Sequence, residues 1–293
     1  MWSLLSSFLL QRKVFLYVNG FISEKFSCKY GVPQGSVLAP LLFIFFINNI
    51  LDEPNPTDRN LGDGMFLFKF ADDLSVNISA HNFVTLMTNT KNVCDKLTKW
   101  CNKLRLKINT DIGKSEILVH TFEITDDLSK MSLQGGEICY VTSSPVLGLT
   151  FDSKLTWQKH WNKIYASSIQ KMVILKRNIF SKFGPKFTTI VLLFNTMVSS
   201  SVLYCSEVWS HNHLNKLNKL WYDFLKVSFW SPYNPEILST EVLASTLPLN
   251  YQAIKRCIKF ILINIFSSDD FYRLTIMKQY ISFMGFSSSS RSS

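Results

Sequence analysis

The sequence MFLFKFADDLSVNIS, residues 65–79, sets two adjacent carboxylates between two runs of alternating apolar residues. Phe occupies every second position over residues 66–70, and Leu, Val and Ile do the same over residues 74–78. A period of two is typical of β-strands, whose successive side chains point to opposite faces. The stretch therefore predicts a hairpin with Asp72 and Asp73 at its tip.

Two adjacent aspartates at a hairpin tip are most often ordinary turn residues, because Asp bonds nearby backbone N–H groups. Here the apolar flanks hold the backbone, and neighbouring carboxylates repel each other unless a cation neutralises them. Hard oxygen ligands suit Mg²⁺, which keeps water and substrate phosphates in its remaining positions. Asp72 and Asp73 are thus candidate ligands for metal-dependent phosphoryl transfer, with the ordinary turn as the alternative.

A second unusual stretch, YGVPQGSVLAP at residues 30–40, precedes a strongly apolar run. Gly31 and Gly35 allow a backbone to come close to a ligand, and Gln34 offers an amide for hydrogen bonding. Pro40 suits the first turn of a helix, which we predict over residues 41–50. Both a helix-entry loop and part of a ligand pocket fit this stretch.

Hydrophobic periodicity divides the rest of the chain into a mixed part and a helical part. In the mixed part we predict strands at 13–18, 21–30, 116–120 and 145–151, and a helix at 89–106. After Trp157 we predict helices around 190–209 and 214–229, preceded by one with an apolar stripe of Tyr165, Ile169, Met172, Val173, Lys176 and Ile179. The fold class is therefore α+β, an antiparallel sheet packed on helices followed by an α-helical region.

The charge of the chain favours a polyanionic partner. The net charge is +10, and no Asp or Glu occurs between Ser153 and Ser206. Such a surface suits a phosphate backbone, although one basic helix can also be a solvated face. The candidate backbone contacts are Lys154, Lys159, Lys163, Lys171, Lys176 and Arg177.

Several other site classes are not indicated. The six Cys residues lack a C-x-x-C spacing, which argues against a zinc ribbon or a redox pair. His211 and His213 lack further ligands nearby in sequence, and we interpret them as surface residues. We expect no signal peptide and no membrane span, because the run at 37–47 is too short and that at 187–205 is diluted by polar residues.

Taken together, YGVPQGSVLAPLLFIFFINNI (30–50) and FKFADDLSV (68–76) resemble reverse transcriptases of non-LTR, LINE-like retrotransposons. The resemblance continues in order. LTKWCNKLRLKINTDIGKSEILVH (97–120) looks like the helix and loop with a lysine at the pyrophosphate, and VLGLTFDSKLTWQKH (146–160) looks like the primer grip. LLFNTMVSSSVLYCSEVW (192–209) is similar to the helical thumb of these elements.

The resemblance implies a role for each matched residue. Asp72 and Asp73 would be the catalytic, metal-binding pair, and Lys114 would act at the leaving group. The nucleotide pocket would comprise Gly31, Gln34, Gly35 and Phe70, and the primer grip would comprise Leu147, Gly148 and Leu149. It also implies Mg²⁺ or Mn²⁺, deoxynucleoside triphosphate substrates, an RNA template and a DNA primer.

The resemblance further implies a partial palm at residues 1–155, a basic helical thumb and connection at 156–250, and a C-terminal helix with a disordered Ser-rich tail at 251–293. Localisation would be intracellular, nuclear or cytoplasmic, and no oligomeric state is predicted. The family also uses a third carboxylate upstream, where Glu24 is the sole acid and sits on a predicted return strand. We therefore expect an N-terminally truncated reverse transcriptase domain with impaired synthesis.

Two alternatives stay open. The chain could be a catalytically dead retroelement remnant that only binds nucleic acid through its palm and basic thumb. It could also be an unselected pseudogene product that folds poorly, with core exposed where the missing strand and fingers should pack.

The spacing between Asn109 and Lys114 is longer than the family usually shows. This difference weakens the role of Lys114 as a general acid.

Overall fold

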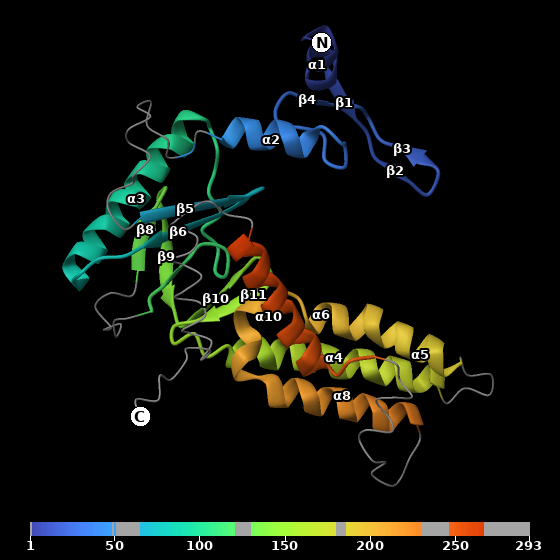
Figure 1. The fold of residues 1–293 in the computed structure, drawn as a ribbon. Coiled ribbons are helices and arrows are strands. Elements are labelled where there is room, and N and C mark those ends of the chain that lie inside the picture. Colours follow the sequence, from blue (N-terminus) through green and yellow to red (C-terminus); the bar gives the residue numbers. More distant parts are fainter. Residues whose placement is uncertain are drawn as a thin grey trace. The chain divides into compact units, whose positions relative to one another are not determined.

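The computed structural model describes residues 2–48, 50, 65–120, 130–179, 186–229 and 246–266. The chain divides into two compact units, one of Met1–Ile117 with Ile124–Tyr140 and one of Leu118–Glu123 with Val141–Ser293 (Figure 1). Small antiparallel sheets with helices make up the first, and helices dominate the second, which confirms the mixed α+β class with a helical C-terminal region. The Ser-rich tail and the loop around Pro54 to Gly64 lie outside the described residues.

The first unit begins with a short helix and four short strands. These are α1 (Trp2–Leu9), β1 (Arg12–Val14), β2 (Tyr17–Val18), β3 (Phe21–Ile22) and β4 (Phe26–Cys28). β2 pairs with β3 around the predicted turn at Asn19 and Gly20, and β1 pairs with β4. The predicted strand and return strand are thus each interrupted. Glu24 therefore lies between β3 and β4 and not on a strand. At this interruption the Ser23 hydroxyl accepts a hydrogen bond from the Leu16 N–H and donates one to the Glu24 carbonyl, in place of strand pairing.

Helix α2 (Ala39–Ile47) follows the YGVPQGSVLAP stretch and carries Pro40 in its first turn. Ser36 Oγ accepts a 3.2 Å hydrogen bond from the Ala39 N–H and donates to Pro33 O. The N–H groups in the first turn of a helix have no partner within the helix and need an acceptor such as this hydroxyl. Proline has no N–H, so at this position it leaves no donor unpaired. A helix is confirmed here, but it spans Ala39–Ile47 instead of 41–50. The notion that its apolar run is buried is wrong, because Ala39 is its one buried residue and Phe45 is 72% exposed.

The predicted hairpin at residues 65–79 is confirmed as β5 (Met65–Phe70) and β6 (Asp73–Ile78). Its register opposes Leu67 to Val76 and Phe68 to Ser75, so the two apolar sets face opposite sides. The side with Leu67 and Val76 packs against a core of α3 (Phe83–Lys103), β8 (Lys130–Leu133) and β9 (Gly136–Val141). The centre of that core is Val93, Cys94, Leu97, Leu133 and Ile138.

Helix α3 begins at residue 83, earlier than the sequence predicts, because Asn82 caps it. The Asn82 Oδ1 accepts a 2.8 Å hydrogen bond from the Thr85 N–H, which satisfies one of the free donors of the first turn. Beside α3 lies a three-stranded sheet of order β7-β9-β8, in which β7 spans Glu116–Leu118.

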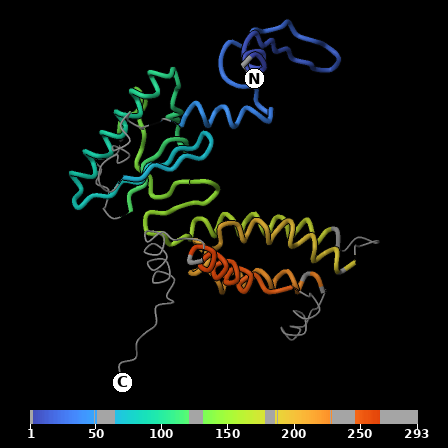
Figure 2. Tube along the Cα trace, turned by 45° about the horizontal axis from the view of Figure 1, so that its top comes forward, coloured from blue at the N-terminus to red at the C-terminus, as the bar shows by residue number. Residues whose placement is uncertain are grey.

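The second unit starts with an antiparallel hairpin, β10 (Ser143–Val146) and β11 (Leu149–Asp152), and continues as helices. Figure 2 shows several of these helices running alongside one another. They are α4 (Gln158–Ile179), α5 (Phe187–Phe194), the π-helix η2 (Asn195–Ser199), α6 (Ser200–Val202), α7 (Ser206–Trp209), the 3₁₀-helix η3 (Ser210–Asn212), α8 (Leu214–Phe229) and α10 (Leu249–Phe266).

Large aromatic residues fill the core of this unit. Trp209, Trp221, Phe194 and Phe224 are almost fully buried, and the Phe194 and Phe224 rings stack with centroids 3.7 Å apart. Such side chains each bury a large apolar area and dominate core energetics. The buried residues of α4 include His160, Trp161, Ser168, Met172 and Leu175.

Two sequence predictions about this core are wrong. Val173, which is 44% exposed, and Lys176 both lie outside the buried side of α4, although the sequence placed them in its apolar stripe. The side of α4 that carries Leu175 packs inward instead. His213 is buried rather than on the surface, and its ring stacks on Trp161 at 5.7 Å. Its Nε2 lies 3.2 Å from Thr156 O. The lack of nearby metal ligands in the sequence does not indicate whether a histidine is exposed, and here the flat ring packs against tryptophan.

No single described helix is both long and apolar enough to cross a membrane. A bent pair, Thr188–Val202 with Ser206–Asn212, meets the length and composition criterion when its two arms are taken together. The apolar residues Phe194, Val198, Val202 and Trp209 of this pair are buried in the helical core.

Candidate functional site

The carboxylate pair lies in and beside a two-residue turn. Phe70 and Asp73 are the last opposed residues of the hairpin, so Ala71 and Asp72 form the turn between them. Ala71 has φ +50°, a left-handed conformation that costs a residue with a Cβ on the order of 1–2 kcal/mol. The tight turn leaves Asp72 and Asp73 next to each other and exposed.

The face of the hairpin that carries Asp73 is aromatic and exposed. Cross-strand partners share a face, so Asp73 lies on the side of Phe70, together with Phe66 and Phe68. These phenylalanines are 49%, 60% and 64% exposed in the order 66, 68, 70. The structure therefore brings Phe70 and Asp73 together beside an uncovered apolar surface.

The pair fits a divalent cation of the hard, oxygen-binding kind. Neither Asp72 nor Asp73 has a hydrogen-bond or ion-pair partner among the described residues, so their oxygens are free to coordinate. Within that described part of the chain, no group of three or more His, Cys, Asp or Glu could hold a metal. Mg²⁺ is commonly held by only one or two carboxylates, with water and substrate phosphates completing its shell.

The loop of residues 30–38 is held by Arg12. Its Nη2 donates hydrogen bonds to the carbonyls of Tyr30 (3.0 Å) and Gly31 (2.5 Å). Gly31 and Gly35 have φ of +76° and +84°, and nothing lies within 4 Å of where a Cβ would be. Backbone conformation, rather than a close neighbour within the described residues, therefore accounts for these glycines. Gln34 is exposed.

One side chain connects the helix after this loop to the hairpin. Lys69 Nζ donates a 2.6 Å hydrogen bond to Asn48 O, which follows α2. The described residues show no hydrogen bond between residues 30–38 and the Asp72–Asp73 tip. The two motifs are therefore connected by the hydrogen bond between Lys69 and Asn48, which flank them. Gln34 makes no hydrogen bond with Asp72 or Asp73 among the described residues.

Lys114 lies in an exposed loop between α3 and β7. Its N–H donates to Asp111 O at 3.0 Å, and Ser115 Oγ donates to Asn109 O at 2.7 Å. Gly113 has φ +81°, which this compact turn requires. The Lys114 side chain is exposed and makes no hydrogen bond with Asp72 or Asp73 among the described residues.

The segment matched to the primer grip forms the turn of the β10–β11 hairpin. Leu147 and Gly148 have φ of +47° and +85°, and Val146 opposes Leu149. Positive φ at both central residues gives the turn that best matches strand twist. Leu149 is buried, whereas Leu147 is 44% exposed. The turn therefore exposes the side chain of Leu147, while the buried side chain of Leu149 anchors the backbone that follows it.

The candidate phosphate contacts differ in their surroundings. Lys154, Lys163 and Arg177 are exposed. Lys159 Nζ bonds Thr142 Oγ1 (3.1 Å) and Ser143 Oγ (2.9 Å). Lys171 is partly buried and donates a 2.7 Å hydrogen bond to Ser201 Oγ. Lys176 is exposed near the end of α4. The outward-facing members, rather than Lys171, therefore supply the basic surface.

A buried carboxylate organises the start of this surface. Asp152 accepts hydrogen bonds from the N–H groups of Lys154, Thr156 and Trp157, the last at 2.7 Å. Burial alone would raise the pKa of Asp152, but the hydrogen bonds from Thr156, Trp157 and Lys154 outweigh it and lower that pKa. The charged carboxylate thereby fixes the loop that leads into α4.

Two sets of residues were missed by sequence reasoning. Tyr204 donates a 3.0 Å hydrogen bond to Leu147 O across 57 residues, and no local pattern indicates such a pairing. Lys255, Arg256 and Lys259 line one side of a cavity in the second unit. Three cations at positions i, i+1 and i+4 of a helix that contains no Asp or Glu would have indicated a basic helix face from the sequence.

Comparisons with known proteins identify the family of the chain. Residues 2–151 match the family model "Reverse transcriptase (RNA-dependent DNA polymerase)". The chain is similar to the RNA-directed DNA polymerase from mobile element jockey of Drosophila melanogaster, with 25% identity over 75% of this chain and 24% of that protein. It is also similar to the jockey polymerase of Drosophila funebris, with 23% identity over 80% of this chain and 25% of that protein.

A third relative is the probable RNA-directed DNA polymerase from transposon BS of Drosophila melanogaster, 24% identical over 75% of this chain and 24% of that protein. The chain thus spans about a quarter of the length of the curated relatives it matches. No solved structure matches it significantly. Because the family model covers more than half of the chain, including the carboxylate hairpin and the turn at Gly148, the chain belongs to the reverse transcriptase (RNA-dependent DNA polymerase) family and resembles the enzymes of jockey-type non-LTR retrotransposons.

Proposed function

We propose that this chain forms the palm and thumb portion of a retroelement reverse transcriptase that extends a DNA primer on an RNA template. The observation that carries the proposal is the exposed Asp72–Asp73 pair on a strained two-residue turn within the family match. Backbone strain that the surrounding structure maintains is concentrated at functional sites.

The residues of the hairpin have separable roles in this proposal. Asp72 and Asp73 hold a divalent cation, which supplies positive charge where the reacting phosphate develops negative charge. Phe70, on the same face as Asp73, provides an aromatic surface on which a nucleotide can stack. Gly31, Gln34 and Gly35 form a further part of the nucleotide pocket, and the exposed Lys114 is available to the leaving pyrophosphate.

The second unit supports the proposal through its charge. The exposed Lys154, Lys163 and Arg177 lie in a stretch without acids, between Ser153 and Ser206. Cations of this kind bind a phosphate backbone and release its counterions. The turn of Leu147 and Gly148 takes the role of the primer grip.

A second candidate function is nucleic-acid binding without synthesis. It is favoured by one observation, that only two carboxylates gather at the hairpin and no larger group of metal-binding residues occurs in the described part of the chain. A two-metal site normally needs further ligands to hold and orient both ions.

Primer extension separates the two functions. Extension of an oligodeoxythymidylate primer on polyriboadenylate is measured with Mg²⁺ and with Mn²⁺. The proposed polymerase extends the primer, and Asp72→Asn lowers the rate at least about a hundredfold, because it removes an ionic ligand from the site of developing charge. Asp95→Asn, the same change at an exposed position of α3, leaves the rate unaltered.

If the wild-type chain extends no primer above the Asp72→Asn background while it still binds RNA–DNA duplex, the binding function stands and the polymerase proposal fails. Circular dichroism of both variants checks that neither change unfolds the chain. Surface substitutions of this size usually change stability by less than about 0.5 kcal/mol.

A further inference from the structure

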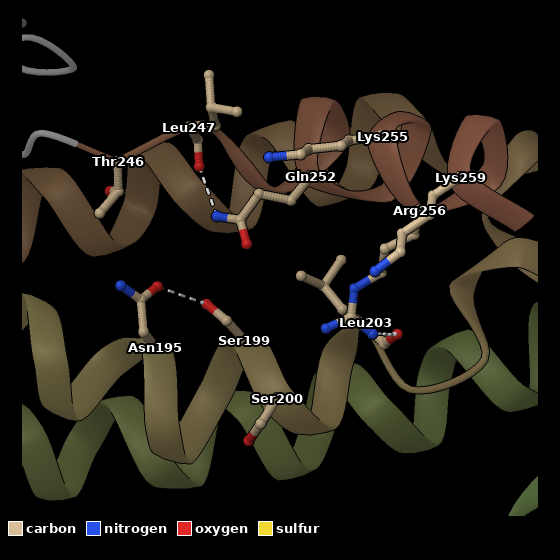
Figure 3. Close-up of a pocket in the computed structure, with 10 residues that line it drawn as sticks. All are labelled: Asn195, Ser199, Ser200, Leu203, Thr246, Leu247, Gln252, Lys255, Arg256 and Lys259. Atoms are coloured by element: carbon tan, nitrogen blue, oxygen red, sulfur yellow. Dashed lines mark hydrogen bonds between the residues drawn. The ribbon is translucent and has the colours of Figure 1, made fainter.

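An open cavity of about 540 Å³ lies at the surface of the helical unit, between the π-helix η2 and helix α10 (Figure 3). Its volume is in the range of ligand pockets, which run from about 300 to 1,000 Å³. None of the site residues assigned above lines it. The residues that line it are Asn195, Ser199, Ser200, Leu203, Thr246, Leu247, Gln252, Lys255, Arg256 and Lys259.

The α10 side of the cavity is strongly cationic. Lys255, Arg256 and Lys259 fall within a stretch of five residues, which covers about 6 Å of the helix axis. No Asp or Glu lines the cavity, and α10 contains none. Lysines at positions i and i+4 repel each other and weaken a helix. Lys255 and Lys259 have no ion-pair partner among the described residues, so an anion in the cavity would relieve this repulsion.

Arg256 fixes the cationic wall in place. Its Nη1 donates a 2.7 Å hydrogen bond to Leu203 O, at the end of α6. The carbonyls at a helix end have no partner within the helix, and a cation satisfies one favourably. Arg256 thereby attaches α10 to the opposite wall, while Lys255 and Lys259 remain uncommitted.

The opposite wall adds neutral polar groups. Asn195 Oδ1 accepts a 3.2 Å hydrogen bond from Ser199 Oγ, so its Nδ2 remains a donor. On the other side, next to the start of α10, Thr246 Oγ1 is buried and has no hydrogen-bond partner within the described residues, a state that costs free energy. The part of the wall that carries Asn195 and Ser199 is a π-helix, a rare form that is frequent at functional sites.

We propose that this cavity binds the phosphate groups of a nucleic-acid strand. Cations with neutral donors and no acceptor carboxylate suit a phosphodiester, and two lysines one turn apart can meet successive phosphates. No aromatic side chain lines the cavity for a base to stack on, so binding is independent of base sequence. The choice of nucleic acid as the ligand rests on the proposed function.

The test is the salt dependence of binding a labelled oligouridylate, measured by fluorescence anisotropy on the full chain without metal or nucleotides. The test variant is Lys255→Gln with Lys259→Gln, and Arg256 is left intact because it holds the wall. The control is Lys219→Gln with Lys226→Gln, which removes the same charge from exposed positions of α8.

Each phosphate contact contributes about 0.7 to the slope of log K against log salt for a single strand. We expect the cavity pair to reduce the slope by about 1.4 and the affinity at about 0.1 M salt by roughly 25-fold. The control pair should change the slope by much less.

Each outcome is decisive. Equal effects of the two pairs overturn this inference and leave the proposed function standing. A loss confined to the cavity pair supports the inference even if primer extension fails, which overturns the proposed function alone. A wild-type chain that binds no strand overturns both.

Discussion

The hydroxyl of Tyr204 donates a 3.0 Å hydrogen bond to the backbone carbonyl of Leu147, 57 residues earlier in the chain. This bond attaches the β10–β11 turn to the segment between α6 and α7. A Cβ on Gly148 would lie 3.4 Å from Tyr204 Cε1, so the ring also covers the turn. Tyr204 is therefore a positioning residue for the turn of Leu147 and Gly148, for which we propose the primer-grip role.

Replacing Tyr204 with Phe should loosen that turn with little effect on overall stability. Water can hydrate the Leu147 carbonyl once the hydroxyl is removed, so we expect the free energy of unfolding to fall by about 0.5–1 kcal/mol. Amide hydrogen exchange of residues 143–152 should accelerate. Tyr165→Phe, in which the ring stacks on Trp161, is the matched control and should leave exchange in this hairpin unchanged. Unaltered exchange in Tyr204→Phe would contradict the positioning role.

Asp152 should contribute a large, pH-dependent share of the stability of the helical unit. Asp152→Ala removes an ionised acceptor from the N–H groups of Lys154, Thr156 and Trp157, and should cost roughly 2–3 kcal/mol. Urea unfolding followed by tryptophan fluorescence measures the loss. Lys154→Ala keeps the backbone donor and should cost much less.

The direction of the pH effect follows from the lowered pKa of Asp152. A carboxyl group with a folded-state pKa below its unfolded value of about 3.9 contributes fully above that value. The contribution disappears as pH falls through the folded-state pKa. Wild-type protein should therefore lose the advantage over Asp152→Ala in strong acid, and a constant difference across that range would contradict the assignment.

His160 should make the same unit sensitive to mild acid. It is 2% exposed, and its Nδ1 accepts a 3.2 Å hydrogen bond from the Thr150 N–H, so the neutral ring is the form that fits. Burial, with the charge of Lys163 and then His213, lowers the pKa of His160 to about 4. The unfolded value is about 6.5, so stability is full above pH 6.5 and falls as pH drops toward 4.

The loss between these limits should be on the order of 2 kcal/mol. His160→Gln keeps an acceptor for Thr150, and should be less stable than wild type at neutral pH but lose less on acidification. Urea midpoints at both pH values measure this difference. His81→Gln, at an exposed position, should retain the wild-type pH dependence. Equal pH dependence in the two variants would assign the effect to other groups.

The sequence was sufficient to predict features set by local periodicity. Alternation at residues 65–79 predicted the hairpin and its opposite apolar faces, because a strand's side-chain period does not depend on its partners. Pro40 located the start of α2 within a residue. The motif order around Gln34 and Asp72 also identified the family, because several residue types must recur in order for the match.

Features that depend on tertiary contacts were not predictable. The bond from Tyr204 to Leu147 joins residues that no local pattern relates. The burial of His213 depends on the position of the Trp161 ring. The outward position of Val173 follows from which side of α4 meets its neighbours, and one residue of phase rotates that side by about 100°. The cavity at Lys255 required α10 and η2 to be placed together.

The basic residues of α4 should separate into binding and structural groups. Lys163 is exposed, whereas Lys171 donates to Ser201 Oγ at 2.7 Å and is partly buried. Lys163→Gln should therefore reduce the slope of log K against log salt for duplex binding by about 0.9. Lys171→Gln should leave the slope unchanged and lower the free energy of unfolding by about 1 kcal/mol, the typical net value of such a hydrogen bond. Salt titrations and urea unfolding of both variants give the two readouts. If Lys171→Gln lowers the slope as much as Lys163→Gln does, the prediction is wrong. The Lys171 ammonium would then leave Ser201 and contact a phosphate when nucleic acid binds.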